Sequence, residues 1–265
     1  MSDLTVLGVT LIDSCELVKT QQKSHTICPK QGQFRARAFV SGVTVVERTG
    51  YSMPTRARSM TSRPEDVLIY HITDIANLPG IIASGLQSDA VMVQSGQHSV
   101  IGYDHIKLRR LQEIGVGCCG PRYVGEFVPF YFCPRTPMLY TVNRGNTGKP
   151  EGCQSDIVHL VSSVGTGVGL QREWAFSDGN AGAYHTDFYN DISKLADLDW
   201  STINAKYWGE KRHQKQSEFL VAEQFPWQGI HFIGCYNQAA VERVQEIVRN
   251  STHQPEVRVK NDWYF

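Results

Sequence analysis

The sequence predicts an α+β fold built on a mixed or mostly antiparallel β-sheet with flanking helices. Two observations support this class. Short apolar runs of strand length, rich in β-branched and aromatic residues, alternate irregularly with helical segments instead of following a regular βαβ order. The chain has 265 residues with 41% hydrophobic and 20% charged content, which is typical of a globular protein with a substantial core. No GxGxxG or P-loop motif is present, so a dinucleotide, if bound, is not held by those fingerprints.

Charge and cysteine content exclude several classes of protein. The formal net charge is zero, so any binding to a polyanion must come from local clusters of Lys and Arg. The seven cysteines have no CxxC pair and no His/Cys metal spacing, which predicts reduced thiols, a cytoplasmic location and no metal site. No apolar run approaches the roughly 18 residues that a membrane-spanning helix needs, and no secretory leader opens the chain, so no membrane association is expected.

The first 66 residues differ from the rest of the sequence. Two short β-like runs, at 4–12 and 39–46, are separated by polar sequence, and the basic stretch 53–64 has the composition of a linker. Met60 lies shortly before the first strong motif and could serve as an alternative start. We therefore expect residues 1–66 to be either an extension of unknown role or the product of a gene start set too far upstream. The functional domain is predicted to span 67–265.

The first strong motif is a strand over 67–73 that ends in His71 and Thr73. Either Thr73 or Asn77 can cap the helix that follows, and Gly85 suits the end of that helix. A single histidine after a strand is more often a structural hydrogen-bonding group than a functional one, so this motif alone does not decide the function.

A loop rich in Gly, Ser and Gln opens the stretch 94–112, which then continues as a short helix with paired arginines. Arg109 and Arg110 are adjacent, so on a helix their side chains point about 100° apart and at most one can face a given site. Such arginines can grip a diphosphate or can simply face solvent.

The remaining chain predicts further strands, one clear helix and one long loop. The strands fall at 127–132, 156–163, 173–176, 229–236 and 256–260, and an amphipathic helix falls at 237–249. Pro129 places the first of these strands at a sheet edge or bulge. Residues 183–208 are polar with scattered aromatics, which predicts one or two short helices within a substrate-facing loop.

The stretch 215–221 brings a basic lead-in and a carboxylate, Glu218, to the entrance of an apolar strand. A strand that enters the core holds such a carboxylate rigidly at the edge of the sheet. Surface carboxylates far outnumber catalytic ones, so the spacing alone favours a solvated charge over a catalytic group.

Taken together, the motifs resemble those of the DarT family of DNA ADP-ribosyltransferase toxins over about residues 67–265. The motifs that carry the resemblance are Ile69-Tyr70-His71-Ile72-Thr73 with Asn77-Leu78 and Gly80, the run 105–110, the run 128–140, His159-Leu160-Val161-Ser162-Ser163, Glu218-Phe219-Leu220-Val221 with Phe225-Pro226-Trp227, and Asp262-Trp263-Tyr264. The resemblance implies a split-sheet ADP-ribosyltransferase fold. It also implies a toxin that transfers ADP-ribose from NAD to a base of single-stranded DNA, with a DarG-type macrodomain antitoxin as a partner.

The resemblance assigns roles to individual residues. His71, Ile72 and Thr73 match the residues that hold the nicotinamide and its ribose, and Asn77 and Gly80 match the NAD-binding motif. Arg110 matches the catalytic arginine, and 94–112 matches a lid over NAD. Glu218 matches the catalytic glutamate, and 178–217 matches the loop that presents the target base. Some relatives carry a histidine in the first turn of that loop, where this chain has Asn180.

DNA contacts are expected from basic and polar residues near the predicted site. They are Arg135, Met138, Asn180, His185 and Lys215, together with Arg144, Lys149, Lys211, Arg212 and aromatics of the 183–208 loop. The target base is expected to be thymine at N3. Guanine in single-stranded DNA is the close alternative, and a catalytically silent nucleic-acid-binding module is the alternative from another class.

Overall fold

The computed structural model describes residues 63–95, 104–146 and 149–265, without the side chains of 104–107. The predicted strands at 4–12 and 39–46 and part of the predicted lid therefore lie outside the described residues. The strands are β1 Leu68–Asp74, β2 Leu86–Gln87, β3 Phe127–Tyr131, β4 Ile157–Ser163, β5 Trp174–Asn180, β6 Phe188–Tyr189, β7 Ser217–Ala222, β8 Gln224–Phe225, β9 Phe232–Cys235 and β10 Glu256–Val259. The α-helices are α1 Leu78–Ser84, α2 Asp89–Gln94, α3 Asp104–Gln112, α4 Pro137–Asn143, α5 Val164–Gly169, α6 Trp200–Ile203, α7 Arg212–Lys215 and α8 Gln238–Val248.

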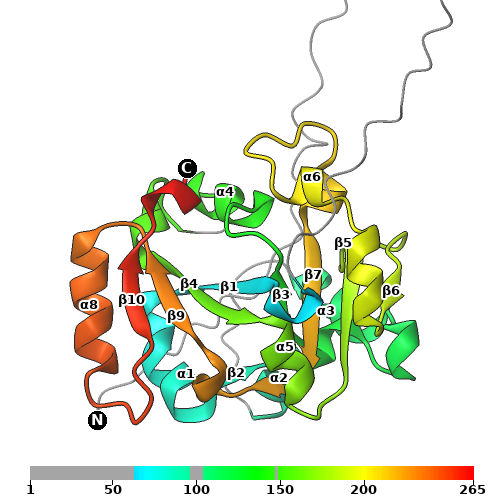
Figure 1. The fold of residues 1–265 in the computed structure, drawn as a ribbon, viewed down its shortest axis with the longest axis horizontal. Helices are drawn as coiled ribbons and strands as arrows, with labels where there is room; N and C mark the ends of the chain where they lie inside the picture. The colour runs from blue at the N-terminus through cyan, green and yellow to red at the C-terminus, as the bar shows by residue number, and fades with distance from the viewer. Residues whose placement is uncertain (1–62, 96–103, 147–148) are drawn as a thin grey trace, which may run out of the picture. The chain divides into compact units, whose positions relative to one another are not determined.

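Eight strands form one mixed sheet in the order β10-β9-β4-β1-β3-β7-β5-β6 (Figure 1). The β9–β10 pair is parallel, and the other pairs in this sheet are antiparallel. In the middle of the sheet, β1 pairs with β3 at one position, Tyr70 with Tyr131. By contrast, β1 pairs with β4 along its whole length, from Leu68 to Asp74. The sheet is thus split between β1 and β3, as the resemblance implies.

Pro129 lies beside this split. It occupies the middle of β3, where its partner on the other side is Leu220 of β7. Proline cannot donate to a strand ladder, so it is tolerated only where one side of the strand needs no donor. The expectation that Pro129 marks an edge or bulge is wrong, because β3 lies between β1 and β7 and pairs with β7 without a register shift. The proline is tolerated in this interior strand because the ladder toward β1 is open there.

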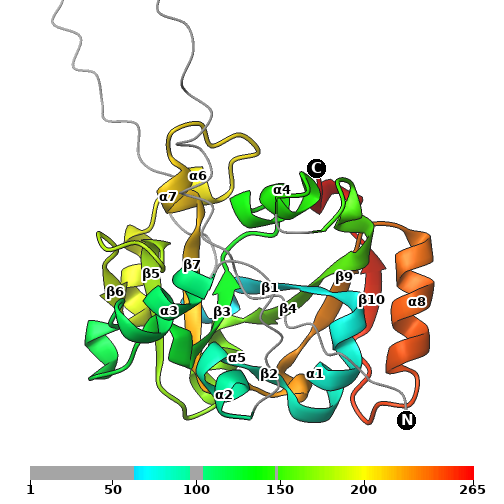
Figure 2. The same cartoon turned by 180° about the vertical axis from the view of Figure 1, so that it is seen from behind.

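Apolar side chains pack on both faces of the sheet. The largest cluster includes Phe130 and Phe219 from the central strands, and Ile81 of α1, Val164 of α5 and Val244 of α8 cover it. A second cluster joins Ile72 and Tyr131 to Met138 and Leu139 of α4 and to Tyr264. Figure 2 shows α4 and the C-terminal residues together at one end of the sheet. Helices therefore flank the sheet on both sides, which confirms the α+β prediction.

Local signals explain several element boundaries. The Asn237 side chain accepts a hydrogen bond from the backbone N–H of Ala240 and so caps α8. Gly85 ends α1 with φ of 75°, a conformation that favours glycine. Asn77 occupies the N-cap position of α1, but its side chain makes no capping bond there. It donates instead to Thr73 Oγ1, at 3.0 Å.

One predicted boundary is wrong in a way that matters for the site. The sequence analysis ends the third core strand at residue 176 and places a turn at 177–182. In the structure β5 continues to Asn180, with an irregularity in its pairing to β7 between Phe176 and Asn180. The polar, Gly-containing sequence resembles a turn because bulged strands use the same residue types.

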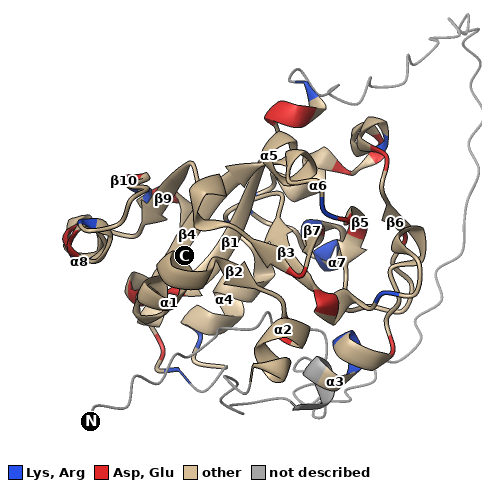
Figure 3. Ribbon diagram, turned by 90° about the horizontal axis from the view of Figure 1, so that it is seen from below, with Lys and Arg blue, Asp and Glu red and all other residues tan. Residues whose placement is uncertain are grey.

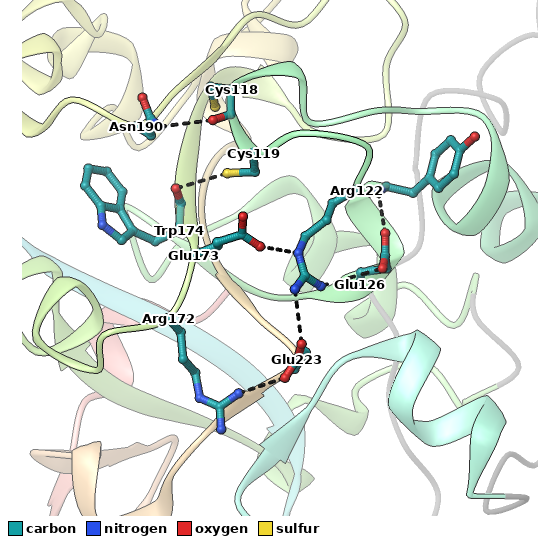
Figure 4. A network of polar contacts seen from close by, with 10 residues as sticks. Cys118, Cys119, Arg122, Glu126, Arg172, Glu173, Trp174, Asn190 and Glu223 are labelled. Atoms are coloured by element: carbon teal, nitrogen blue, oxygen red, sulfur yellow. Dashed lines mark hydrogen bonds and ion pairs between the residues drawn. The ribbon is translucent and has the colours of Figure 1, made fainter.

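A surface ion-pair network ties the far end of β7 to its neighbours (Figure 4). The Arg122 guanidinium pairs with Glu173, with Glu126 at 3.6 Å and with Glu223 at 3.2 Å, and Glu223 also pairs with Arg172 at 3.0 Å. These five residues come from the approach to β3, the approach to β5 and the turn after β7. Individual exposed pairs contribute little stability, but several sharing one arginine form a network.

Charged residues of both signs are spread over the described elements, and the ribbon of α3 and α7 includes positions coloured as Lys or Arg (Figure 3). Within the described residues, no helix is long and apolar enough to cross a membrane. The same part of the chain holds no group of three or more His, Cys, Asp or Glu residues arranged to hold a metal ion.

Candidate active site

The Glu218 carboxylate lies in the interior, with the residue 1% exposed. Its strand β7 runs between β3 and β5, so Glu218 faces Tyr131 across the ladder and is flanked on both sides. Oε1 accepts a hydrogen bond from the backbone N–H of Ala181, at 3.1 Å. The Glu218 backbone N–H donates to Ser177 Oγ, at 3.0 Å. The interpretation of Glu218 as a solvated strand-end charge is therefore wrong.

Arg110 of α3 supplies the opposite charge. Its Nη2 lies 3.4 Å from Glu218 Oε2, and the residue is 4% exposed. Burial alone would lower the pKa of the Arg110 guanidinium, but the negative charges of Glu218 and Asp89 hold that pKa above its ordinary value. The guanidinium is thus positively charged near neutral pH. Removing two charged groups from water costs free energy that their mutual attraction only partly offsets. A buried pair of this kind therefore points to a role other than stability.

The neighbouring arginine points elsewhere, as the helical geometry predicts. Arg109 places its guanidinium carbon 5.8 Å from the centre of the Tyr184 ring. Tyr184 is 70% exposed, and its hydroxyl donates to Glu113 at the end of the same arginine-bearing segment. The loop 181–187 therefore contacts the α3 segment through Arg109, while Arg110 turns toward Glu218.

The irregularity in β5 is what brings a backbone donor to Glu218. Asn180 pairs with Ser217 after the register shift, and its Oδ1 accepts from the backbone N–H of Gly182 at 2.8 Å. This turn aims the Ala181 N–H at the Glu218 carboxylate. The chain after Glu218 reads as a strand, whereas nothing in the local sequence around Ala181 signals a carboxylate contact, so sequence reasoning missed this residue.

His71 sits on β1 at the split. Its Nδ1 lies 2.8 Å from the carbonyl oxygen of Pro129 on β3, and its ring meets Phe130 edge-on at 5.7 Å between ring centres. Because the partner is a carbonyl, Nδ1 carries the hydrogen and Nε2 is left as an acceptor. Burial lowers the pKa of His71, which keeps the imidazole neutral. The histidine thus bridges the two halves of the sheet and still offers one acceptor.

The other predicted NAD contacts lie near the far end of β1. The Asn77 side chain donates to Thr73 Oγ1, while Asn77 Oδ1 is buried without a hydrogen-bond partner among the described residues. Gly80 lies in α1 and is half-buried. Ile72 points into the cluster of Tyr131 and Met138, so its side chain is enclosed by protein. A ligand could reach Ile72 only through its backbone.

Two predicted DNA contacts are not supported by the structure. Met138 is 0% exposed because it anchors α4 in the core. Lys215 is 2% exposed, and its ammonium donates to the carbonyl oxygens of Ile203 at 2.5 Å and Ala205 at 2.7 Å. Both side chains are therefore closed off from a strand of DNA. Lys215 fixes the loop that precedes Glu218 instead of meeting phosphate.

The remaining predicted DNA contacts differ in exposure. His185 is exposed, and its ring lies 4.3 Å from that of His213. Arg135 is half-buried and donates to the carbonyl oxygen of Tyr264, at 2.6 Å. Asn180 is 2% exposed, so its side chain shapes the turn beside Glu218. The structure brings Arg110, Glu218 and Asn180 together, while Arg135 and His185 lie on segments that flank the start of β7.

The donors and acceptors at the site suit a dinucleotide. Arg110 Nε and Asn77 Oδ1 are buried and have no hydrogen-bond partner among the described residues. A guanidinium N–H matches a phosphate or hydroxyl oxygen, and an amide oxygen matches a hydroxyl or amide N–H. Beyond Tyr70, the described strands leave one edge of β1 unpaired, so its backbone groups can meet a planar amide.

Comparison with known proteins identifies the group to which these features belong. The family model described as "ssDNA thymidine ADP-ribosyltransferase, DarT" matches residues 70–265. A relative from Thermus aquaticus named "DNA ADP-ribosyl transferase" is 37% identical over 205 residues, which are 76% of this chain and 90% of the relative.

Two solved structures of Thermus sp. 2.9 DarT have the same fold. The complex with ADP-ribosylated ssDNA superposes with a TM-score of 0.70 at 37% identity, covering 77% of this chain and 99% of that one. The complex with NAD+ gives a TM-score of 0.65 at 35% identity, covering 77% of this chain and 100% of that one. On the family model, the sequence identity and the shared fold, this chain belongs to the DarT family of single-stranded DNA ADP-ribosyltransferases.

Proposed function

We propose that this protein transfers ADP-ribose from NAD to N3 of thymine in single-stranded DNA. The observation that carries the proposal is the Glu218 carboxylate, which is buried, oriented by the Ala181 N–H and paired with Arg110. Family membership and the relatives' NAD+ and ADP-ribosylated ssDNA complexes support the same reaction.

Glu218 stabilises the charge that develops when the nicotinamide–ribose bond breaks. The bonding electron pair leaves with nicotinamide, so the ribose carbon becomes positively charged. A carboxylate already held in place lowers the energy of this transition state more than that of the ground state. The hydrogen bond from Ala181 and the pairing with Arg110 fix its two oxygens, so the carboxylate need not reorganise during the reaction.

Arg110 acts on the incoming base. Thymine N3 becomes a nucleophile when it loses its proton, and a nearby guanidinium favours the resulting anion electrostatically. Because the pKa of Arg110 is held above its ordinary value, the guanidinium supplies positive charge instead of accepting the proton. The N3 proton passes to solvent water, and the N3 anion then forms the new bond to the ribose carbon as the nicotinamide–ribose bond breaks.

His71 and β1 position the sugar and the amide. The neutral His71 ring presents Nε2 as an acceptor for a ribose hydroxyl, since Nδ1 is occupied by the Pro129 carbonyl. The unpaired edge of β1 near Thr73 offers backbone groups to the nicotinamide amide. Gly80 and Asn77 line the same end of the strand.

The substrate must be single-stranded because a base edge is inaccessible within a duplex. Thymine N3 takes part in Watson–Crick pairing, so the reaction needs an unpaired nucleotide. A lesion of this kind would block the replication of DNA. The proposed role is therefore that of a cytoplasmic toxin held in check by a macrodomain antitoxin that removes the modification.

The decisive experiment combines the protein and NAD with oligonucleotides that lack thymine, lack guanine or contain both. We expect mass spectrometry to show a gain of one ADP-ribose on every oligonucleotide that contains thymine. If only the oligonucleotides that contain guanine gain the mass, the target base is guanine and the thymine proposal is wrong. If no oligonucleotide gains mass, and Glu218→Ala leaves DNA binding and cellular toxicity unchanged, the protein is a silent binding module.

A further inference from the structure

Three aromatic rings from distant parts of the chain meet beside the start of β7. They are Tyr140 of α4, Trp208 before α7 and Phe265 at the end of the chain. Ring centres are 6.4 Å apart for Tyr140 and Trp208, 5.1 Å for Tyr140 and Phe265, and 6.0 Å for Trp208 and Phe265. The reaction chemistry gives this cluster no role, although the sequence predicts DNA contacts from aromatics of the 183–208 loop, which includes Trp208.

Two arginines border the rings. The Arg135 guanidinium carbon lies 4.2 Å from the centre of Phe265, and that of Arg144 lies 6.0 Å from the centre of Tyr140. We call these five residues the aromatic–arginine patch. Tyr140 is 42% exposed and the Arg144 side chain is 54% exposed, while Arg135, Trp208 and Phe265 are half-buried. The patch therefore offers ring surface and positive charge to solvent.

Hydrogen bonds to neighbouring residues fix the backbone and side chains of the patch. Gln154 accepts a hydrogen bond from the Phe265 backbone N–H at 2.9 Å, and Arg135 donates to the Tyr264 carbonyl oxygen at 2.6 Å. The buried Lys215 ammonium lies 5.8 Å from the centre of the Trp208 ring while it binds the loop carbonyls. Rigid, preorganised aromatic surface binds a ligand without a large cost in side-chain entropy.

The patch lies near the reacting groups but does not contain them. Lys215 precedes Glu218 by three residues, a distance of at most about 10 Å of extended chain. Arg135 follows Tyr131, the strand partner of Glu218, by four residues. Figure 1 shows α4, the C-terminus and the α6 region gathered at the end of the sheet where β7 begins. A polymer bound at Glu218 would reach the patch within a few monomer units.

We propose that the aromatic–arginine patch binds a nucleotide that flanks the target base, with its base stacked on Tyr140 and its phosphate near Arg144. The inference rests on the proposed function, because it assumes single-stranded DNA as the ligand. Aromatic rings alternating with cations are the combination that binds single strands, since every base has a stacking face and every nucleotide a phosphate. Within the part of the chain that the structure describes, the ion pair of Arg144 is with Glu151, at 3.0 Å on the surface, so phosphate can replace that partner at little cost.

The test measures binding without NAD, so it does not depend on transfer. Two fluorescent oligonucleotides share one target thymine; one has long flanks and the other has a single nucleotide on each side. We expect wild-type protein to bind the long oligonucleotide more tightly, and Tyr140→Ala to weaken that binding roughly tenfold more than binding of the short one. Tyr140→Phe keeps the ring and should restore the affinity.

The chain offers matched controls. Tyr123 is 39% exposed and precedes the opposite end of β3, so Tyr123→Ala should change neither affinity. Arg144→Gln should weaken binding of the long oligonucleotide and lower the number of counterions released on binding by about one, which reduces the salt dependence of its affinity. Arg258, which also pairs with a glutamate and lies 4.6 Å from a phenylalanine ring, should tolerate the same substitution.

Each other result overturns the inference. Equal affinity of the wild-type protein for the long and the short oligonucleotide would contradict it. So would a Tyr140→Ala variant that loses the same affinity for both oligonucleotides. A Tyr123→Ala variant that loses as much affinity as Tyr140→Ala would also contradict it. A separate transfer assay on the short oligonucleotide reports the proposed function. If transfer fails while length-dependent binding persists, the patch stands and the proposed chemistry does not.

Discussion

At the scale of single residues, the site depends on a charge that is both buried and held by hydrogen bonds. Glu218→Gln keeps the size of the side chain and can keep the bond from Ala181 to its oxygen, but it removes the negative charge. We expect the transfer rate to fall by about 10²–10³, the magnitude measured when one preorganised electrostatic contact is removed. Initial rates at saturating NAD and DNA, with circular dichroism to verify folding, measure the effect.

The control for this substitution lies a few residues along the chain. Glu223 follows β7, has a half-exposed side chain and pairs with Arg122 and Arg172 on the surface. Glu223→Gln should retain close to the wild-type rate, because the charge it removes lies in the surface network. A similar loss from both variants would mean that the effect comes from the fold of β7 and that Glu218 has no special role.

A second residue-scale prediction concerns pH. His159 is fully buried; its Nε2 donates to the Pro134 carbonyl oxygen at 2.9 Å, and burial lowers its pKa to about 4. The unfolded chain takes up a proton on this imidazole at a pKa near 6.5, while the folded chain does not, so the unfolded state binds more protons below that pH. The free energy of unfolding should therefore fall by about 3 kcal/mol as the pH drops from 6.5 to 4.

Urea unfolding at pH 7, 6 and 5 measures this slope. His159→Gln preserves a donor toward Pro134 but cannot ionise, so its stability should depend less steeply on pH over this interval. The imidazole of His71, whose pKa is also lowered, remains in both proteins and contributes equally to both curves. Parallel pH dependences for the two proteins would contradict the assignment to His159.

At the scale of elements, the position of β7 depends on how closely α5 approaches it. A Cβ added at Gly167 would lie 2.5 Å from Phe219, the residue after Glu218. We expect Gly167→Ala to cost about 1–3 kcal/mol of stability, because the buried Phe219 ring, stacked on Trp174, has no free space. Since Phe219 cannot move without β7, the transfer rate should fall as well.

Gly169 of the same helix provides the comparison. A Cβ added there meets no atom within 4 Å, so Gly169→Ala should leave stability unchanged or raise it by about 0.4–1 kcal/mol through the unfolded state. Thermal unfolding and transfer rates of the two variants decide the matter. Equal melting temperatures for both would show that the Gly167 contact with Phe219 is not restrictive.

Elements with strong periodicity could be predicted from the sequence, whereas bulges could not. The strands at 67–73 and 156–163 and the helix at 237–249 are confirmed within a residue or two, since each couples an apolar pattern to a clear boundary. The extension of β5 to Asn180 was missed because a bulged strand uses the residues of a turn. The sequence predicts that Lys215 contacts DNA because a basic lead-in normally faces solvent, while in the structure its ammonium donates to loop carbonyls.

At the scale of the whole molecule, the site comes from contacts between residues far apart in sequence. Arg110 and Glu218 are 108 residues apart, and His71 meets Pro129 over 58 residues. No spacing rule joins such positions, so resemblance to a family could bring them together where periodicity could not. Both contacts lie close to the split between β1 and β3. The split leaves one edge of β1 open beside β3, the strand whose Tyr131 pairs with Glu218.

The organisation of the whole chain leads to a final prediction. We propose that residues 67–265 form the active domain, because the family model begins at residue 70 and the buried core of the described residues begins at Val67. The turn Pro64–Asp66 precedes it and packs against α5. A chain started at Met60 keeps this turn and its Arg63–Asp66 ion pair. We therefore expect it to match the full chain in melting temperature and in transfer rate per molecule. A chain started after α1, which lacks His71 and Thr73, should bind no NAD. If the Met60 chain folds but transfers slowly, residues 1–59 contribute to the reaction.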